Sequence, residues 1–156
     1  MAALTNAMEN RLLDWLLRGQ ALGLAGASAA AGSGPANTYV ALFTGEPTDS
    51  GDAVEVVGGG YARVAVASSL ASWAGTQGAT TTAVSNGASG TTSNNVVITF
   101  PVPTAYWGPV VAVGLFDTAI GGTLLIYGRL IVLRVVSTGD AAPAFTSGSI
   151  QFQIDS

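Results

Sequence analysis

The chain has 156 residues, of which 49% are hydrophobic and only 9% are charged, and its formal net charge is −4 at pH 7. It contains no His and no Cys, which excludes disulfides, imidazole or thiolate metal sites, and catalysis by Ser-His-Asp or Cys-His systems. The acidic balance argues against nucleic-acid binding, which depends on Lys and Arg contacts to phosphate. No cofactor is expected.

The length predicts a single compact domain with a core of its own. Membrane insertion is not expected. The longest apolar stretch, residues 124–136, is interrupted by Gly128 and carries Arg129 and Arg134. A helix that crosses a membrane needs about 20 predominantly apolar residues with few charges, and this stretch is too short and too charged.

The first segment predicts an amphipathic helix from Asn6 to Arg18. Asp14 and Arg18 are spaced to form an i,i+4 ion pair on its polar side, and Gly19 ends the pattern. The apolar side chains recur at steps of three and four residues and form one stripe: Met8, Leu12, Trp15 and Leu16, with Leu13 as a further candidate.

The helix is followed by residues 20–37, in which Ala, Gly and Ser dominate and which are typical of a flexible linker. We therefore expect three parts: an N-terminal helix at residues 1–19, a linker at residues 20–37, and a β domain at residues 38–156.

The β domain is predicted from short runs of β-forming residues that are separated by Gly and Pro turns. Gly121 and Gly122 indicate a hairpin turn. The fold class that this pattern favours is mainly β: an antiparallel β-sandwich, jelly-roll-like or immunoglobulin-like, of about eight short strands with one N-terminal amphipathic helix. The expected strands are residues 38–44, 54–57, 61–67, 96–100, 110–117, 123–127, 130–136 and a final, strictly alternating strand around 150–154.

Residues 75–95 are rich in Thr, Ser, Gly and Asn and contain one sizeable apolar side chain, Val84. Such a segment has little apolar surface to bury, so it predicts a long exposed loop. Long loops within compact domains are often functional, which makes this segment a candidate contact surface.

Two sets of carboxylates are candidates for a metal site or a catalytic site. The cluster Glu46, Asp49, Asp52 and Glu55 lies in a Gly/Pro turn region and has oxygen ligands suitable for Ca²⁺, but its spacing fits no twelve-residue calcium loop. A solvated turn explains these residues better. Asp117, Asp140 and Asp155 are candidates for glycoside hydrolysis, yet nothing fixes any two of them at the required separation. No catalytic residue and no metal ligand is therefore predicted.

Three aromatic residues are candidate contacts for a protein partner or a glycan: Trp73, Tyr106 and Trp107. The alternative is that these side chains close the ends of the sandwich. The glycines Gly58–Gly60 indicate a special backbone conformation, because a phosphate-binding loop would also need a lysine or a following helix. Arg63, Arg129 and Arg134 lie within expected strands and should point outward or pair with carboxylates across an interface.

Several blocks of sequence occur in an order that resembles a known family. They are residues 10–14 (NRLLD), 39–44 (YVALFT), 55–63 (EVVGGGYAR), 98–101 (ITFP), 107–111 (WGPVV), 114–117 (GLFD) and 121–125 (GGTLL). Together they resemble the small tailed-bacteriophage virion proteins known as tail-fibre proteins, over nearly the whole chain. The resemblance implies a structural protein that is made in the host cytoplasm and located in the virion. A capsid-surface knob or decoration protein, or a receptor- or glycan-binding module, remains an alternative.

The low charge and the expected strand edges also indicate self-association, because uncovered edges and apolar patches lead to aggregation. We expect a homo-oligomer, with a trimer as one candidate. The helix, through Leu12, Trp15 and Leu16, is expected to pack against partner subunits or to anchor the chain to other virion proteins. Deleting residues 1–34 is then expected to leave the β domain folded and to abolish assembly.

Overall fold

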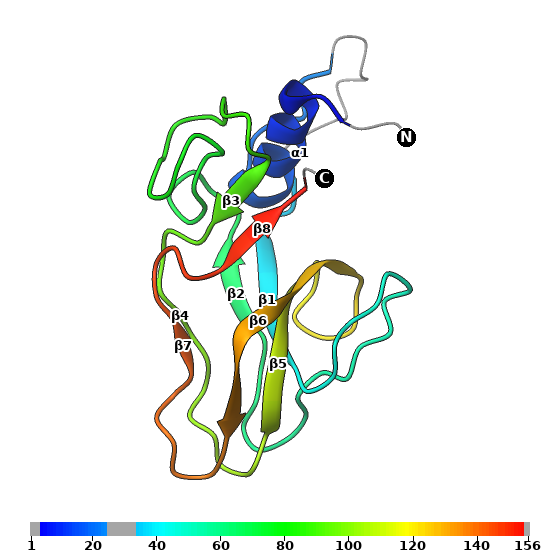
Figure 1. Ribbon diagram of the computed structural model, residues 1–156, viewed down its shortest axis with the longest axis vertical. Helices are drawn as coiled ribbons and strands as arrows, with labels where there is room; N and C mark the ends of the chain where they lie inside the picture. The colour runs from blue at the N-terminus through cyan, green and yellow to red at the C-terminus, as the bar shows by residue number, and fades with distance from the viewer. Residues whose placement is uncertain (1–3, 25–33, 155–156) are drawn as a thin grey trace. The chain divides into compact units, whose positions relative to one another are not determined.

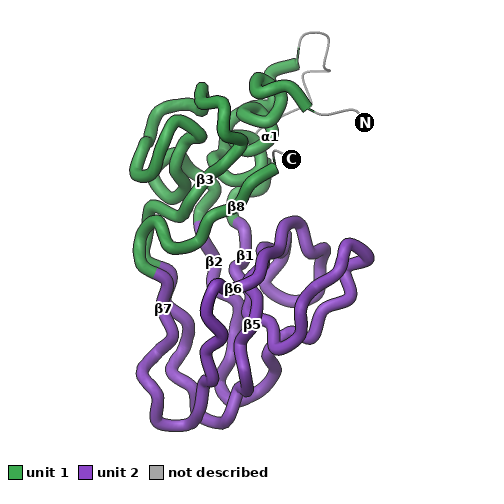
Figure 2. Tube along the Cα trace, viewed as in Figure 1, with its two compact units in different colours: residues 1–37, 67–97, 146–156 green, residues 38–66, 98–145 purple. Residues whose placement is uncertain are grey.

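The computed structural model describes residues 4–24 and 34–154, and the fold is mainly β with one N-terminal helix and eight strands (Figure 1). The chain divides into two compact units (Figure 2). Unit 1 contains residues 1–37, 67–97 and 146–156, and unit 2 contains residues 38–66 and 98–145. The helix thus shares a unit with two later segments of the chain, which differs from the division at residues 19 and 37 expected from composition. Residues 25–33, which are half of the expected linker, lie outside the described residues. Within the described part of the chain, no helix is long and apolar enough to cross a membrane.

The helix of unit 1 is α1, Asn6–Arg18, with the bounds expected from the sequence. The Thr5 side chain caps its first turn by accepting from the backbone N–H of Met8. At the other end, Gly19 adopts a left-handed conformation (φ 69°) and its N–H donates to the carbonyl oxygen of Asp14. The ends of this helix are therefore determined by local capping.

The face that α1 turns inward differs from the one that its apolar pattern predicts. Leu13 and Leu17 are buried, together with the polar side chains of Glu9, Asn10, Asp14 and Arg18. The expected stripe of Met8, Leu12, Trp15 and Leu16 is only half-buried. The neighbouring segment of unit 1 supplies hydrogen-bonding partners for Asn10, Asp14 and Arg18, which permits their burial.

That neighbouring segment is residues 75–95, and the prediction of a structureless exposed loop there is wrong in part. It contains a strand, β3 (Thr91–Ser93), which pairs antiparallel with β8 (Gln151–Gln153). Thr76 and Ser85, which carry hydroxyl groups, are buried within it. Polar segments can be ordered inside a unit when their polar groups are hydrogen-bonded.

The main sheet has the strand order β2-β1-β5-β6, and all but the end residues of β1 and β2 belong to unit 2. Its strands are β1 (Asn37–Phe43), β2 (Val64–Ala67), β5 (Gly108–Phe116) and β6 (Leu124–Val136). β5 pairs antiparallel with both β1 and β6, and the glycine turn joins β5 to β6 as expected.

Two strand expectations fail in unit 2. Residues 123–127 and 130–136 form the single strand β6, because Gly128 continues the ladder by pairing with Val113. Residues 54–57 form no strand, and Glu55 makes only an isolated bridge to Phe43. Edge and turn positions lack the strong pattern of central strands, so sequence resolves them poorly.

Unit 2 also contains a small ribbon, β4 (Ile98–Thr99) paired antiparallel with β7 (Ala144–Phe145). The ribbon contacts aromatic residues that flank the main sheet: Phe100 stacks on Tyr61 at 6.1 Å between ring centroids and meets Phe145 edge-on at 6.2 Å. A second cluster packs Ala41 and Phe43 of β1 against Ala112 and Phe116 of β5. The turn at residues 58–63, which precedes β2, therefore contacts the packed aromatic residues of unit 2 through Tyr61.

Candidate functional site

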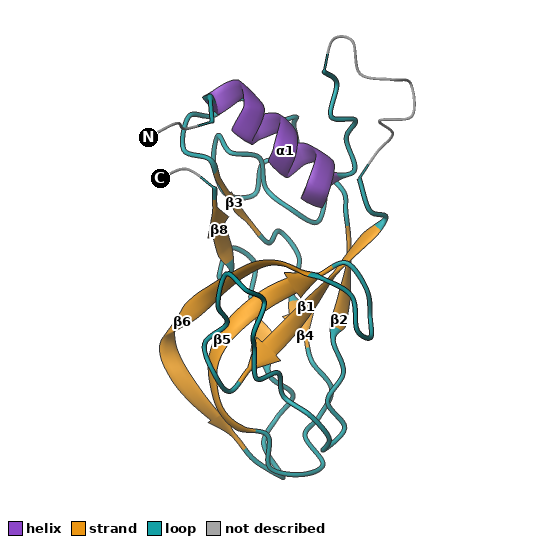
Figure 3. Ribbon diagram, turned by 90° about the vertical axis from the view of Figure 1, so that its right-hand side faces the viewer, coloured by secondary structure: helices purple, strands orange, loops and turns teal. Residues whose placement is uncertain are grey.

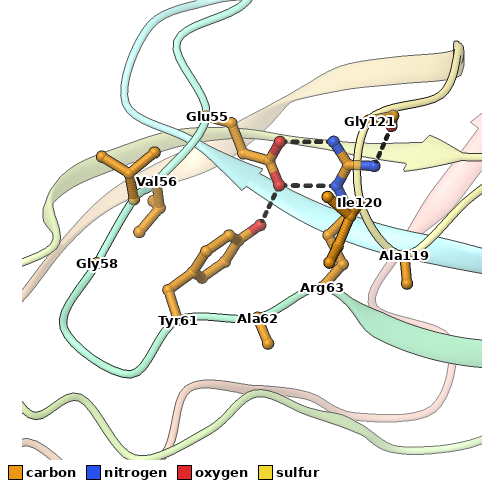
Figure 4. Close-up of a pocket in the computed structure, with 10 residues that line it drawn as sticks. Glu55, Val56, Gly58, Tyr61, Ala62, Arg63, Ala119, Ile120 and Gly121 are labelled. Carbon is orange, nitrogen blue, oxygen red and sulfur yellow. Dashed lines mark hydrogen bonds and ion pairs between the residues drawn. The ribbon is translucent and has the colours of Figure 1, made fainter.

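A pocket of about 480 Å³ opens on unit 2 between residues 55–63 and the turn 119–121 (Figure 4). Its polar groups are the side chains of Glu55, Tyr61 and Arg63. Exposed apolar side chains, Val57 and Ile120, lie among the residues that line it. No pocket was expected here, although Glu55, Tyr61 and Arg63 all lie in the block at residues 55–63 that carries part of the family resemblance.

Glu55 and Arg63 form a bidentate ion pair in this pocket (Figure 4). Nε of Arg63 donates to Oε1 of Glu55 at 2.9 Å, and Nη2 donates to Oε2 at 2.7 Å. The Tyr61 hydroxyl donates to Oε1 of Glu55 at 2.9 Å and accepts from the backbone N–H of Leu42 at 2.9 Å. The Tyr61 hydroxyl thus links the Glu55 carboxylate to the backbone of strand β1.

The remaining donors of Arg63 bind the turn between β5 and β6. Nη1 donates to the carbonyl oxygens of Thr118 (2.9 Å) and Gly121 (2.7 Å), and the guanidinium lies 3.4 Å from the centre of the Phe116 ring. Arg63 thus pairs with a carboxylate of its own unit, whereas the sequence predicted a pair across an interface. We call Glu55, Tyr61 and Arg63 the clamp, because their polar groups hold three segments of unit 2 together.

The surroundings of the clamp strengthen the preference of Tyr61 for its protonated form. Burial raises the pKa of the Tyr61 hydroxyl well above its ordinary value, and the negative charge of Glu55 raises it further. A protonated phenol that donates to an already paired carboxylate is a poor base or nucleophile. The clamp is thus suited to holding structure rather than to acid–base chemistry.

The glycines before Tyr61 have the backbone role expected of them. Gly58, Gly59 and Gly60 all adopt positive φ angles, between 56° and 77°. A Cβ on Gly59 would lie 2.9 Å from the indole ring of Trp107, whose ring N–H donates to the Gly59 carbonyl oxygen at 2.8 Å. The turn therefore packs against Trp107. It is followed by strand β2, whereas a phosphate-binding loop would be followed by a helix.

The three candidate aromatic contacts lie in different surroundings. Trp73 is fully buried in unit 1, where its ring lies 6.1 Å from that of Phe152. Trp107 is buried in unit 2 and meets Tyr61 edge-on at 5.4 Å. Neither ring has a face free for stacking, in agreement with the alternative of a packing role. Tyr106 is 64% exposed and is available for contact.

The carboxylates of the candidate calcium cluster bind different partners. Glu46 lies 3.4 Å from Nε of Arg129, Asp49 accepts from the Tyr127 hydroxyl, and Glu55 belongs to the clamp. In the described ranges, no group of three or more acidic side chains is placed to hold a metal ion.

The aspartates considered as candidates for glycoside hydrolysis stabilise turns. Asp117 accepts from the backbone N–H of Thr123 at 2.7 Å, and Asp140 accepts from that of Ser137 at 2.7 Å. Asp155 lies outside the described residues. The described pair is therefore occupied in backbone support, as the turn interpretation expected.

The polar groups of α1 form a buried network within unit 1. Nη1 of Arg18 donates to Oδ1 of Asp14 and, at 2.9 Å, to the hydroxyl of Ser85. Its Nε donates to the carbonyl oxygen of Trp73 at 2.9 Å, and its Nη2 donates to that of Ala83. The i,i+4 spacing of Asp14 and Arg18 predicted the pair correctly, but no sequence signal placed it inside the unit.

Comparison with known proteins gives one assignment. No curated protein matches the chain. A family model described as Podophage GP4 fiber I protein gp80 matches residues 3–153, which is nearly the whole chain. This match agrees with the resemblance to phage tail-fibre proteins carried by the sequence blocks. The chain belongs to the Podophage GP4 fiber I protein gp80 family, a family of phage fibre proteins.

Proposed function

We propose that this protein is a non-enzymatic structural component of a phage fibre, and that it works by assembling with copies of itself and with other virion proteins. The observation that carries this proposal is the family match over residues 3–153. The polar groups of the pocket support it, because Glu55 and Arg63 bind each other and the backbone of their own unit.

The helix contributes to assembly in this proposal. Its polar side chains are committed to unit 1, whereas Leu12, Trp15 and Leu16 are only half-buried and lie on its other side. Half-buried apolar side chains on a rigid helix are suited to a contact with another virion protein. Trp15→Ser is expected to reduce incorporation into particles without unfolding the chain, and Arg11→Ser, an exposed position on the same helix, is the matched control.

The location of the protein tests the proposal directly. Cryo-electron microscopy of virions, with antibody labelling of this chain, is expected to place it on the fibres of the tail. Labelling on the capsid surface would instead support a decoration protein. Particles that lack the protein altogether, although it is expressed during infection, would refute a structural role in the virion.

The non-enzymatic part of the proposal has its own measurement. Purified protein is expected to release no new reducing ends from host-surface polysaccharide during prolonged incubation. Release of reducing ends would contradict the proposal, and its loss in a Glu55→Gln variant would identify Glu55 as one of the two carboxyl groups that glycoside hydrolysis needs.

Host-surface glycan binding is a second candidate function, and the exposed ring of Tyr106 is the observation that favours it. A glycan array with the wild-type chain and with Tyr106→Ala tests it. Binding that is lost in the variant would support this function. An array without signal would leave the structural role as the one to pursue.

A further inference from the structure

Strand β6 carries a large bulge at its centre. Ala112 of β5 pairs with Arg129, but Val110 pairs with Arg134. A single residue of β5, Val111, therefore lies opposite a run of four residues of β6, Leu130–Leu133. A β-bulge redirects the side chains of the strand that carries it, and bulges are frequent at sheet edges and functional sites. The bulge in β6 therefore determines where the side chains of Leu130–Leu133 point.

The bulge displays apolar side chains to solvent. Ile131 is fully exposed, Val132 is 76% exposed, and Leu133 and Val135 are about half exposed. β6 is also an edge strand: its only strand neighbour in the described part of the chain is β5, and both views place it at the border of the sheet (Figures 1 and 3). An exposed apolar edge strand is a site for pairing with another strand, and natural proteins that keep one cover it.

The charges along β6 indicate what covers it. At one end, Tyr127 and Arg129 contact the carboxylates of Asp49 and Glu46, so this end of the strand lies beside an acidic loop. At the other end, Arg134 is exposed and forms no ion pair with any described residue. One end of the strand therefore lies beside two carboxylates, Glu46 and Asp49, that outnumber the guanidinium of Arg129, and the other end carries the guanidinium of Arg134.

Two copies of such a strand are complementary when they run antiparallel. If Ile131 of one copy lies opposite Ile131 of the other, Arg134 lies opposite Gly128 of the second copy, between the two residues that contact the acidic loop. The opposite charges then meet twice, and the two apolar bulges cover each other. A parallel arrangement would place like ends together.

We propose that the outer edge of β6 is the contact between two copies of this chain, formed by antiparallel pairing centred on Ile131. The backbone groups of the two edges bind each other, the side chains of Leu130–Leu133 form the apolar centre, and Arg134 of each copy faces the other copy's acidic loop. The proposal deepens the proposed structural function and rests on it, since it names the surface through which the fibre component self-associates.

Site-specific cross-linking tests the contact, because the natural chain contains no Cys. Residues opposite each other in an antiparallel pair have Cα atoms about 4.5–5.5 Å apart, which is within the range that a disulfide spans. Ile131→Cys is expected to yield a disulfide-linked dimer on a non-reducing gel. The matched control is Ile120→Cys, at a position of the same unit outside β6 that is 91% exposed. It is expected to give no disulfide-linked dimer and to run as a single chain on the same gel.

A scan with Cys at each position from 130 to 135 makes the result independent of the register. A maximum at one or two neighbouring positions supports the antiparallel contact. Equal cross-linking at every position and at the control, or none at any position, overturns it.

Self-association measured by analytical ultracentrifugation provides the second test. Ile131→Arg is expected to raise the dimer dissociation constant at least about tenfold, whereas Ile120→Arg is expected to leave it unchanged. Arg134→Glu should weaken the dimer, and adding Asp49→Arg in the same chain should restore it. Circular dichroism spectra establish that each variant is folded.

The outcomes separate this proposal from the proposed function. A wild-type oligomer that resists every β6 variant overturns the β6 contact and leaves the structural role intact. A monomeric protein that is still found on virions also overturns the contact alone. Absence of the protein from virions refutes the proposed function, whatever the ultracentrifuge measures.

Discussion

Asp14 and Arg18 form an ion pair with an N–O distance of 2.5 Å, and both side chains are buried inside unit 1. Each partner is satisfied beyond the pair: Asp14 also accepts from the backbone N–H and the hydroxyl of Ser85, at 2.8 and 2.6 Å. Buried charges need such partners, because removal from water costs several kcal/mol for each ion. The network therefore fixes how α1 packs on residues 73–85.

Removal of one member of this pair should destabilise the protein strongly. Arg18→Met leaves the Asp14 carboxylate buried with only part of its hydrogen bonds, which is expected to cost about 3–5 kcal/mol of unfolding free energy. Urea denaturation measures this loss. The matched control is Arg129→Met, whose ion pair with Glu46 is 73% exposed on the arginine side and should contribute about 1 kcal/mol or less. Equal losses in the two variants would contradict a structural role of the buried network.

Truncation of the N-terminal segment should now give a result different from the one that composition suggests. Deleting residues 1–34 removes α1, and Ser85 and the carbonyl oxygen of Trp73 lose their partners on Arg18. Unit 1 is therefore expected to lose its fixed packing. Near-ultraviolet circular dichroism should show a weaker tryptophan signal than the full-length Trp15→Ser variant, which lacks the same ring, and limited proteolysis should cut within residues 75–90. A truncated chain with native spectra and protection would show that α1 is dispensable for folding.

The Tyr61 hydroxyl should contribute to the stability of unit 2. Tyr61→Phe leaves the backbone N–H of Leu42 without its acceptor and removes one hydrogen bond from Glu55. A buried donor without a partner costs about 1–3 kcal/mol. Thermal and urea denaturation are the measurements. Tyr106→Phe, at an exposed ring, is the control and should change the unfolding free energy by no more than about 0.5 kcal/mol.

Stability should fall in alkaline solution because of the same tyrosine. The pKa of Tyr61 is raised in the folded protein, chiefly by burial and further by Glu55. Above the ordinary tyrosine pKa of about 10, an unfolded chain loses this proton while the folded chain retains it, so rising pH favours unfolding. The stability is therefore fully present below about pH 10 and is lost as pH rises through the folded pKa.

Urea denaturation between about pH 8 and about pH 11 tests this pH dependence. The wild-type unfolding free energy should decline across the upper part of this range, and Tyr61→Phe should flatten the decline. The pKa of Tyr127 is raised as well, by its hydrogen bond to Asp49, so Tyr127→Phe shows how much of the decline is specific to Tyr61. An identical decline in wild type and Tyr61→Phe would exclude Tyr61 as its source.

The sequence by itself determined the local features of this protein. The bounds of α1 follow from capping residues and helical periodicity, and the strands at residues 37–43 and 108–116 follow from runs of β-forming residues between turns. The glycine turns at residues 58–60 and 121–122 follow from the backbone conformations that glycine permits. The ordered blocks were sufficient to indicate a phage fibre protein, and the family match agrees with them.

Only the tertiary structure decided which side of α1 is buried, that residues 75–95 accept the charges of Asp14 and Arg18, and that Glu55, Tyr61 and Arg63 meet. It also decided the bulge of β6, since the register depends on the strand opposite. The first three have one physical reason in common. Burial of a polar group is favourable only when a partner lies within hydrogen-bond distance, and that partner is supplied by residues far away in the sequence.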